Sequence, residues 1–532
     1  MIRGTSPVRR RILRGGLAAG SLFLPVPWAW VWAQSEGAAK LLRAPKLALV
    51  MGNSAYRGVP ALKNPGNDSR AVAEALRAAH FDVALVQDAT RERMEEAIGA
   101  HARALAARKA VGLVYYAGHG LQMQWRNYLL PVDAAVVKAA DVPARCVDVT
   151  TLMEALRKAG NPMNVIILDA CRDNPFGAEV QPDRRGLSQA DAPTGSFRAY
   201  PTAPGNTADD GEGAHGLYTE HLLREIRVRE ARIEDVFKRV RLGVRKASGG
   251  RQVPWESTSL EEDFYFFPPE QLRRLSQEEQ EREFREELAA YERVADSRDA
   301  SALEGFLRRH PSGRFAELAQ LRLDAALAAT GEKPVRVPSA RGNLHTAGTE
   351  RMDTAYAVGD RYLYMMLDRL KGGVIPFGRE QVVTAVTENE VIFNDGRMVL
   401  DRLGNVVVNF DGKRFTPRQD KPLEFAVGRR WTTRYGVTRN GVDTGWAETD
   451  FRVVARERIK VPAGTFDAFR VEASRFVGND DGSTREGTVT YWMQPSRVRR
   501  VIIQEEKVWE VTAGRRRVLI DRRIELNRFQ QR

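Results

Sequence analysis

Cysteine is scarce in this chain. Its 532 residues contain two, Cys146 and Cys171, which is too few for a disulfide scaffold, so packing must hold the fold together. The two thiols could still pair with each other. Their contexts differ, because Cys171 closely follows an apolar run whereas Cys146 lies in a polar stretch. The two cysteines are therefore not equivalent.

Long hydrophobic runs are also absent beyond the N-terminal leader, which excludes a polytopic membrane protein. With 43% hydrophobic and 28% charged residues, the composition is that of an ordinary globular protein and excludes disordered and collagen-like classes. The net charge of +13 includes five arginines of the leader, and most other arginines alternate with acids. Such alternation is typical of a solvated surface, so we expect no nucleic-acid partner. The length predicts about three domains.

Residues 1–33 have the pattern of an export signal peptide: a basic start, an apolar run from Leu17 to Trp32, and a small residue, Ala33, at the end. We expect cleavage after Ala33 and a periplasmic or secreted protein. The stretch RRRILR at 9–14 resembles the twin-arginine consensus, and a general secretory signal with a basic start remains the alternative. An uncut anchor is disfavoured by the shortness of the run and its two prolines.

Between residues 46 and 268, short apolar runs alternate with amphipathic helical stretches, which predicts a parallel sheet covered by helices on both faces. The expected strands are 46–51, 81–86, 111–117, 164–169 and, last, 263–267. The expected helices are 68–79, 91–107, 150–159, 218–228 and 233–246. The connection 174–216 is rich in Gly, Pro, Asp and Ser and too long for a simple connector, so we interpret it as a substrate-lining flap or a cleavable segment.

Three further parts follow this α/β domain. Residues 269–330 have a helical pattern with one apolar stripe and a hairpin that resembles a single tetratricopeptide-like unit. Residues 331–346 contain little that packs and are interpreted as a linker. Residues 347–532 alternate in hydrophobicity between turn signals such as Asn394-Asp395-Gly396, which predicts an antiparallel barrel or curved sheet. This last part weakly resembles half-barrel folds of bacterial envelope proteins.

Reactive side chains follow two of the expected strands. The strand 111–117 stops at Gly118-His119-Gly120, and the strand 164–169 stops at Cys171, 52 residues after the histidine. Functional sites form at the carboxyl ends of parallel strands, so we expect the imidazole to lie beside the thiol and manage its proton. A buried structural cysteine and a capping histidine are the alternatives for each residue alone. Their joint occurrence, with roughly the 50-residue spacing of the caspase pattern, favours catalysis.

These motifs resemble those of bacterial caspase-like peptidases related to metacaspases, over residues 46–270. Besides the two strand ends, the resemblance rests on the segments LALVMGNSAY at 47–56, LKN at 62–64 with Asn67-Asp68, APG at 203–205, GLYT at 216–219 and GRQVPWE at 250–256. It implies a multidomain protein with an α/β caspase-like (caspase-hemoglobinase) sandwich. It also implies His119 as the general base, Cys171 as the nucleophile, and the N–H groups of Gly120 and Cys171 as the oxyanion hole.

The resemblance further places two acids in the pocket for the residue before the cleaved bond. Asp169 stands where true caspases have Gln, two residues before the cysteine, and Asp68 matches a metacaspase pocket position. Two partly desolvated carboxylates would reject Asp and accept Arg or Lys, so we expect protein or peptide substrates cleaved after Arg or Lys. The alternative is that Asp169 only orients the backbone and that Asp68 caps the helix that follows it.

One residue departs from the metacaspase pattern: Ala117 stands where metacaspases often have Ser, so a pocket hydroxyl is missing. Metacaspases frequently need calcium. The acids that might bind it show no spacing of a calcium loop; they are Asp173, Asp183, Asp191, Asp209 and Asp210. We therefore expect no metal site and no cofactor, and leave calcium dependence open.

The sequence thus predicts an exported cysteine endopeptidase that forms a thioester on Cys171 after a basic residue. The helical and β parts would then recruit substrates or associate with the cell envelope. The alternative is a catalytically silent caspase-like scaffold or binding protein of the envelope that acts through its β domain, and the intact pair of His119 and Cys171 favours the enzyme. Autoprocessing, if it occurs, is expected within 174–216, for instance after Arg184, Arg185 or Arg198.

Overall fold

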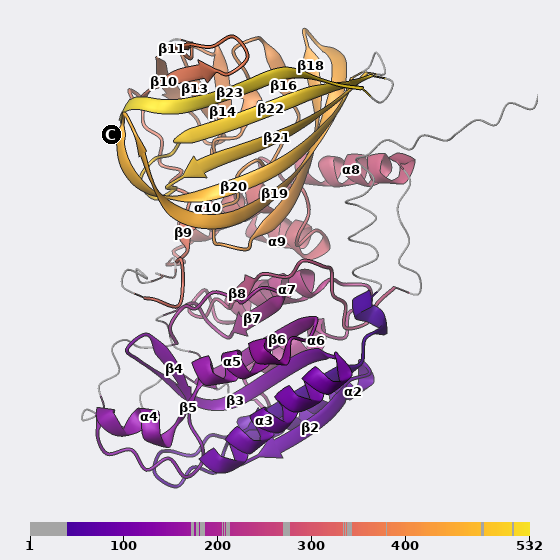
Figure 1. Ribbon diagram of the computed structural model, residues 1–532, viewed down its shortest axis with the longest axis vertical. Helices are drawn as coiled ribbons and strands as arrows, with labels where there is room; N and C mark the ends of the chain where they lie inside the picture. Colours follow the sequence, from indigo (N-terminus) through magenta and orange to yellow (C-terminus); the bar gives the residue numbers. More distant parts are fainter. Residues whose placement is uncertain are drawn as a thin grey trace, which may run out of the picture.

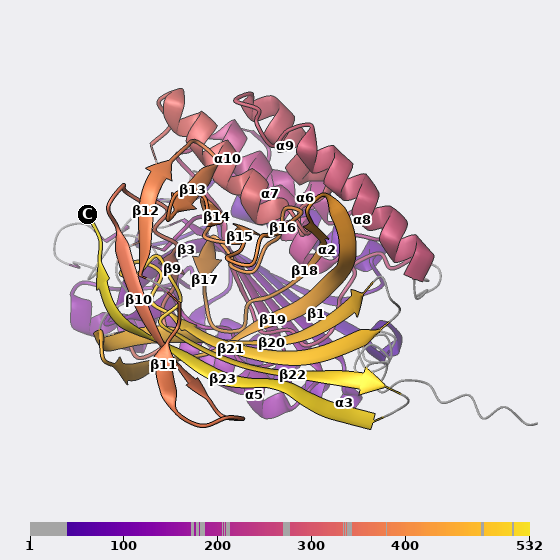
Figure 2. The same ribbon diagram turned by 90° about the horizontal axis from the view of Figure 1, so that it is seen from above.

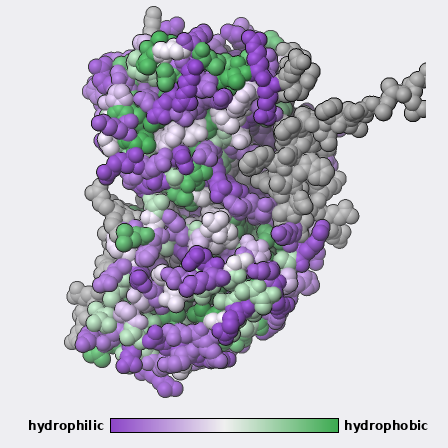
Figure 3. Space-filling model, in the orientation of Figure 1, coloured by the Kyte–Doolittle hydropathy of each residue, from purple (hydrophilic) through white to green (hydrophobic). Residues whose placement is uncertain are grey.

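The computed structural model describes residues 40–532 apart from short internal segments (Figure 1). Those segments are 172–174, 177–179, 181–186, 205, 207, 209–212, 270–276, 334, 336, 338–342, 379, 480–482, 513 and 514. The expected export signal, residues 1–33, lies outside the described residues. Among the described helices, none is long and apolar enough to cross a membrane. Hydrophilic side chains predominate on the face shown in Figure 3, where hydrophobic ones form small groups.

A mixed sheet forms the centre of the N-terminal part. Its strand order is β2-β1-β3-β6-β7-β8; the first five strands are parallel, and β8 is antiparallel to β7. The strands are β1 (Lys46–Gly52), β2 (Asp82–Gln87), β3 (Val111–Met123), β6 (Met163–Cys171), β7 (Ser196–Tyr200) and β8 (Trp255–Thr258). Two short strands, β4 (Arg126–Leu129) and β5 (Val147–Asp148), form an antiparallel extension on the end of β3. The carboxyl end of β3 is therefore held first by β6 and then by β4.

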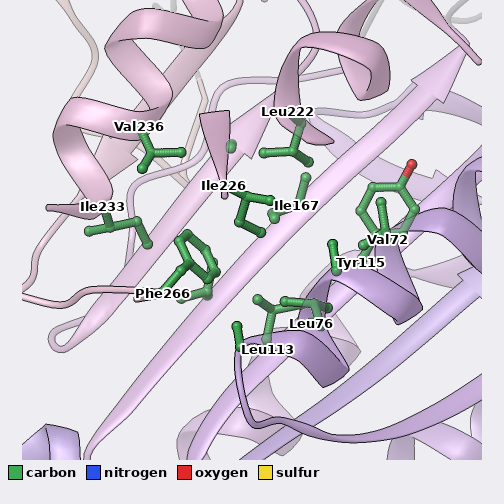
Figure 4. Close-up of a cluster of buried hydrophobic side chains, with 14 of the residues drawn as sticks. Val72, Leu76, Leu113, Tyr115, Ile167, Leu222, Ile226, Ile233, Val236 and Phe266 are labelled. Carbon is green, nitrogen blue, oxygen red and sulfur yellow. The ribbon is translucent and has the colours of Figure 1, made fainter. Parts of the chain in front are cut away.

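Helices cover both faces of this sheet, so the predicted α/β sandwich is confirmed. The helices are α2 (Pro65–Ala78), α6 (Leu217–Glu225) and α7 (Ile233–Ala247) on one face and α3 (Arg91–Arg108) and α5 (Val149–Ala159) on the other, with the short α4 (Val142–Arg145) before β5. Because side chains alternate along a strand, Ala48 and Val50 of β1 join the first core while Leu49 and Met51 join the second. Figure 4 shows side chains of α2, β3, β6, α6 and α7 meeting in the first core.

Two expectations about this domain are wrong. The expected strands leave out β7, which lies within the connection 174–216 and whose five residues are all buried. Residues 263–267 do not form a strand, because Phe264 and Phe266 fill the core beside α7 and Tyr265 makes a single bridge to Arg232. The last strand is β8, which lies earlier in the chain and pairs with β7.

Three helices follow the sheet domain: α8 (Gln277–Glu292), α9 (Ala300–Arg309) and α10 (Ala316–Ala329). The expected apolar stripe is buried, with Phe284 and Tyr291 each 6% exposed. These side chains share one core with Phe451 of β19 and Phe469 of β20 in the C-terminal sheet. The helices therefore pack directly against the β part.

The C-terminal part is an antiparallel sheet that closes on itself. Within the described residues it has thirteen strands in the order β11-β10-β12-β13-β14-β15-β16-β18-β19-β20-β21-β22-β23, and β23 also pairs with β10. The pairing curls the sheet into a barrel-like form (Figures 1 and 2), one of the two forms predicted. The strands are β10 (Arg361–Asp368), β11 (Val374–Pro376), β12 (Gln381–Val386), β13 (Glu390–Phe393), β14 (Met398–Asp401), β15 (Val406–Val408), β16 (Lys413–Phe415), β18 (Arg430–Arg439), β19 (Val442–Val461), β20 (Gly464–Asn479), β21 (Thr484–Met493), β22 (Ile503–Thr512) and β23 (Arg515–Gln530). A separate pair joins β9 (Glu350–Arg351) to β17 (Glu424–Phe425).

A local sequence signal explains the turn between β13 and β14. Asn394, Asp395 and Gly396 have φ values of 48°, 56° and 88° between β13 and β14, the left-handed conformation that the turn signal predicts. In the expected linker 331–346, some of the described residues do pack. Asn343 is 7% exposed, and Val335 and Val337 contact the core on the α3 and α5 face of the sheet.

Candidate active site

The strands β3 and β6 place the two predicted reactive residues at one end of the sheet. In their parallel register His119 lies directly opposite Cys171, and neighbouring strands are only about 4.8 Å apart. The side chain of Cys171 is outside the described part of the structure, so its position is given by the backbone of β6 alone. The two residues that the sequence singles out are thus cross-strand neighbours.

The imidazole of His119 is held by the loop that follows β1. Its Nε2 lies 2.9 Å from the carbonyl oxygen of Pro60, and its ring centroid is 4.7 Å from that of Tyr56. The backbone N–H of His119 donates to the hydroxyl of Tyr56 at 2.8 Å. Because a carbonyl oxygen can only accept, Nε2 carries the proton in this contact, and Nδ1 is the ring nitrogen that can accept one. The contact with Pro60 therefore leaves the proton-accepting role to Nδ1.

The glycines on either side of His119 are required by close neighbours. Gly118 has a φ of 153°, and a Cβ there would lie 2.5 Å from the hydroxyl of Tyr56. A Cβ on Gly120 would lie 2.9 Å from Cβ of Ala170. The carbonyl of His119 accepts from Leu130, so Gly120 forms a non-hydrogen-bonded pair across β4 and its N–H points away from that strand. The N–H of Gly120 is thus not used in the β3–β4 ladder, which an oxyanion-hole donor requires.

Asp169 is positioned by hydroxyl groups from two other elements. Oγ1 of Thr219, on α6, donates to Oδ2 of Asp169 at 2.5 Å, and the hydroxyl of Tyr115, on β3, lies 3.3 Å from the same oxygen. The two hydroxyls are themselves 2.7 Å apart. Burial raises the pKa of the Tyr115 hydroxyl well above its ordinary value, and the negative charges of Asp169 and then Asp68 raise it further. Both acids therefore act on one buried hydroxyl, so the fold brings them to the same neighbourhood.

Asp68 is buried and ties α2 to the start of α6. Nδ1 of His215 lies 2.7 Å from Oδ1 of Asp68, and the N–H of Gly216 donates to Oδ2 at 3.2 Å. Asp68 lies inside α2, whose N-cap is Asn64, so the alternative that Asp68 caps this helix is wrong. The sequence interpretation missed His215, Pro60 and the role of Tyr115. A histidine next to the quoted Gly216 segment is the signal that could have identified the first.

The two cysteines differ as the sequence indicates. Cys146 is 1% exposed and is a free thiol, so the two cysteines do not pair. Burial raises the pKa of the Cys146 thiol to about 12, which leaves it almost entirely protonated near neutral pH. Cys146 is therefore unsuited to be a nucleophile.

Ala117, the residue that departs from the metacaspase pattern, lies inside the sheet. Ala117 is 2% exposed and stands opposite Asp169 in β6 and Gly52 in β1.

Among the described residues, no group of three or more His, Cys, Asp or Glu side chains is arranged to hold a metal ion. Asp191 instead accepts hydrogen bonds from Thr346 and Ala347, while Asp173, Asp183, Asp209 and Asp210 lie outside the described residues.

Comparison with known proteins identifies the kind of domain that carries these residues. Residues 45–265 match the family model described as the caspase domain. A segment of 127 residues is 32% identical to the human mucosa-associated lymphoid tissue lymphoma translocation protein 1, and a segment of the same length is 32% identical to its mouse homolog. Each match covers 24% of this chain and 15% of the relative, so the chain spans only a small part of the length of these proteins. Together with the sheet order and the paired strand ends, the match identifies residues 45–265 as a caspase-like peptidase domain.

Proposed function

We propose that this protein is a cysteine endopeptidase that cleaves protein or peptide chains after Arg or Lys with a Cys171–His119 dyad. The observation that carries the proposal is the register of β3 and β6, which sets His119 opposite Cys171 at the carboxyl end of a caspase-type sheet. The contact between Nε2 of His119 and the carbonyl of Pro60 supports it further, because it leaves Nδ1 as the proton acceptor.

In the proposed reaction the thiol of Cys171 gives its proton to Nδ1 of His119, and the sulfur attacks the scissile carbonyl carbon. The N–H groups of Gly120 and Cys171 stabilise the oxyanion of the tetrahedral intermediate. His119 then returns the proton to the leaving amine as the C–N bond breaks, which leaves a thioester on Cys171. A water molecule, deprotonated by His119, hydrolyses the thioester and frees the thiol.

The pair of Asp169 and Asp68 supports a preference for basic residues. Both carboxylates raise the pKa of the same buried hydroxyl, that of Tyr115. Two negative charges therefore lie near one another, and one of them, Asp169, is on the strand that carries Cys171. A guanidinium or ammonium group would relieve this repulsion, whereas the carboxylate of an Asp substrate would add to it.

The test is hydrolysis of fluorogenic peptides that end in Arg, Lys or Asp, under reducing conditions and with and without calcium. We expect turnover of the Arg and Lys peptides by the wild-type chain and by the matched control Cys146→Ala, whose buried thiol should not take part. We expect no turnover by Cys171→Ala. A folded wild-type chain that hydrolyses none of these peptides would instead favour the scaffold function.

A further inference from the structure

The segment that leads into the C-terminal part is hydrogen-bonded to the chain that follows the nucleophile. We name residues 343–349 the entry segment and residues 187–191 the active-site loop. Nδ2 of Asn343 donates to Oγ of Ser188 at 3.0 Å and to the carbonyl of Gln189 at 2.7 Å. All three residues are buried, so these bonds satisfy polar groups that water does not reach.

A second group of hydrogen bonds continues the same contact. The N–H of Asp191 donates to the carbonyl of His345 at 2.9 Å. Its carboxylate accepts from Oγ1 of Thr346 and from the N–H of Ala347, both at 2.6 Å. The entry segment thus holds the active-site loop through side chains and backbone of both segments.

The active-site loop in turn is hydrogen-bonded to β4 and lies beside the end of β3. Ser188 and Asn127, in β4, exchange two hydrogen bonds: the N–H of Ser188 donates to Oδ1 of Asn127 at 2.5 Å, and Nδ2 of Asn127 donates to the carbonyl of Ser188 at 3.0 Å. Leu187 lies 3.5 Å from the position that a Cβ of Gly120 would take. The contacts therefore lead from the entry segment through Ser188 to Asn127 of β4, and Leu187 lies close beside Gly120, the residue next to His119.

The other end of the entry segment is attached to the barrel-like sheet. Arg456, on β19, donates to the carbonyl of Ala347 at 3.0 Å and forms an ion pair with Glu350 of β9. The entry segment therefore connects the C-terminal sheet with the active-site loop by direct contacts.

We propose that the entry segment is part of the peptidase machinery and that Asn343 is a positioning residue. By fixing Ser188 and Gln189, it holds Leu187 beside Gly120 and Asn127 in register with Gln122 of β3, and so keeps the oxyanion-hole N–H of Gly120 in place. The expected effect of Asn343 on turnover rests on the proposed peptidase function. Its expected effect on the structure of the active-site loop rests on the contacts alone. Since Asp169 and Asp68 lie outside this contact chain, the effect falls on kcat and not on recognition of the basic residue.

The experiment compares full-length Asn343→Ala with full-length Asn161→Ala. Nδ2 of Asn161 also donates more than one hydrogen bond, among them to the carbonyls of Ala110 and Met163 at 2.9 and 2.8 Å, but at the opposite end of β3 and β6. For Asn343→Ala we expect kcat on an Arg peptide to fall roughly ten- to a hundred-fold with KM little changed, as for a modest misplacement of reacting groups. In hydrogen–deuterium exchange, amides at 118–121 and 187–191 should exchange faster in Asn343→Ala and stay at the wild-type rate in Asn161→Ala.

Each outcome decides between the claims. Unchanged exchange at 118–121 in Asn343→Ala, or a wild-type kcat, overturns the positioning role. An equal loss of kcat in Asn161→Ala assigns the effect to general loss of stability and also overturns it. If the wild-type chain hydrolyses no peptide while Asn343→Ala still accelerates exchange at 118–121, the proposed function fails and the coupling of the entry segment to the active-site loop stands.

Discussion

Asp169 is the residue on which substrate preference should depend most directly. Replacing Asp169 by Asn removes a charge but keeps an oxygen that Thr219 and Tyr115 can contact. We expect kcat/KM for Arg and Lys peptides to fall about thirty-fold or more, since a close charge pair is worth at least ~2 kcal/mol when one partner is removed. The thermal midpoint should change little. Steady-state kinetics and thermal unfolding of the same preparation check both points.

Thr219→Val is the matched control for this prediction. It removes a hydroxyl that donates to Asp169 but leaves the carboxylate charge in place, so the preference for Arg over uncharged residues should largely remain. If Asp169→Asn lowers stability and turnover in equal proportion, Asp169 has a purely structural role. This is the alternative, left open by the sequence, that Asp169 only orients the backbone.

The residues of the site differ in how far the sequence alone reveals them. His119 and Cys171 are recognisable because each ends a buried apolar run, and parallel pairing then brings them together. Pro60 acts through its carbonyl, a group that every residue has, so no residue type indicates it. His215 meets Asp68 across 147 positions of the chain. A contact of that range depends on how α2 and α6 pack, which local patterns do not give.

The elements show the same division between local and tertiary causes. The hydrophobic period and the lengths of the apolar runs predict β1, β3 and the helices between them to within a few residues. The exception is the end of β3, which continues to Met123. Strand β7 lies in a segment with the composition of a loop, and its buried Arg198 breaks the apolar run. It forms because β6 and β8 offer partners on both sides. Residues 263–267 have strand-like composition but find no such partner.

This arrangement of strands bears on autoprocessing. Arg198 is 6% exposed within β7, so cleavage after it would require removing a central strand, and we expect none. Cleavage after Arg184 or Arg185 leaves β7 paired with β6 of one fragment and β8 of the other. The two fragments should therefore migrate separately on a denaturing gel and elute together in native size-exclusion chromatography.

The control for autoprocessing is Cys171→Ala, which should stay a single band under the same incubation. Fragments that separate in native chromatography, or a fragment that begins at Ala199, would contradict the prediction. A single band for the active enzyme after long incubation would remove autoprocessing altogether.

At the scale of the whole molecule, the peptidase domain and the helical segment that follows it share contacts along α7. Arg245 of α7 lies 2.7 Å from Oδ1 of Asp324 in α10 and from Oε1 of Glu332. Lys238 of the same helix donates to Ser312. The entry segment adds a second connection near the active site. The parts that the sequence separates as domains are therefore joined at several places, among them an ion pair between Arg452 of β19 and Glu261, which domain-by-domain patterns in the sequence do not reveal.

Arg245→Ala tests whether these joined parts unfold together. The side chains of Arg245, Asp324 and Glu332 are 16%, 17% and 14% exposed, so removing the guanidinium leaves two largely buried carboxylates close together. We expect a loss of roughly 2 kcal/mol, less than for fully buried pairs because these groups keep some contact with water and Asp324 keeps Arg351 as a partner. Calorimetry should show one cooperative unfolding transition for the wild-type chain and two transitions, at lower temperature, for the variant.

The control Arg298→Ala breaks an exposed pair with Glu388 and should leave the number and temperature of the unfolding transitions unchanged. Two separate transitions already present in the wild-type chain would show that the contacts along α7 do not make the parts unfold together.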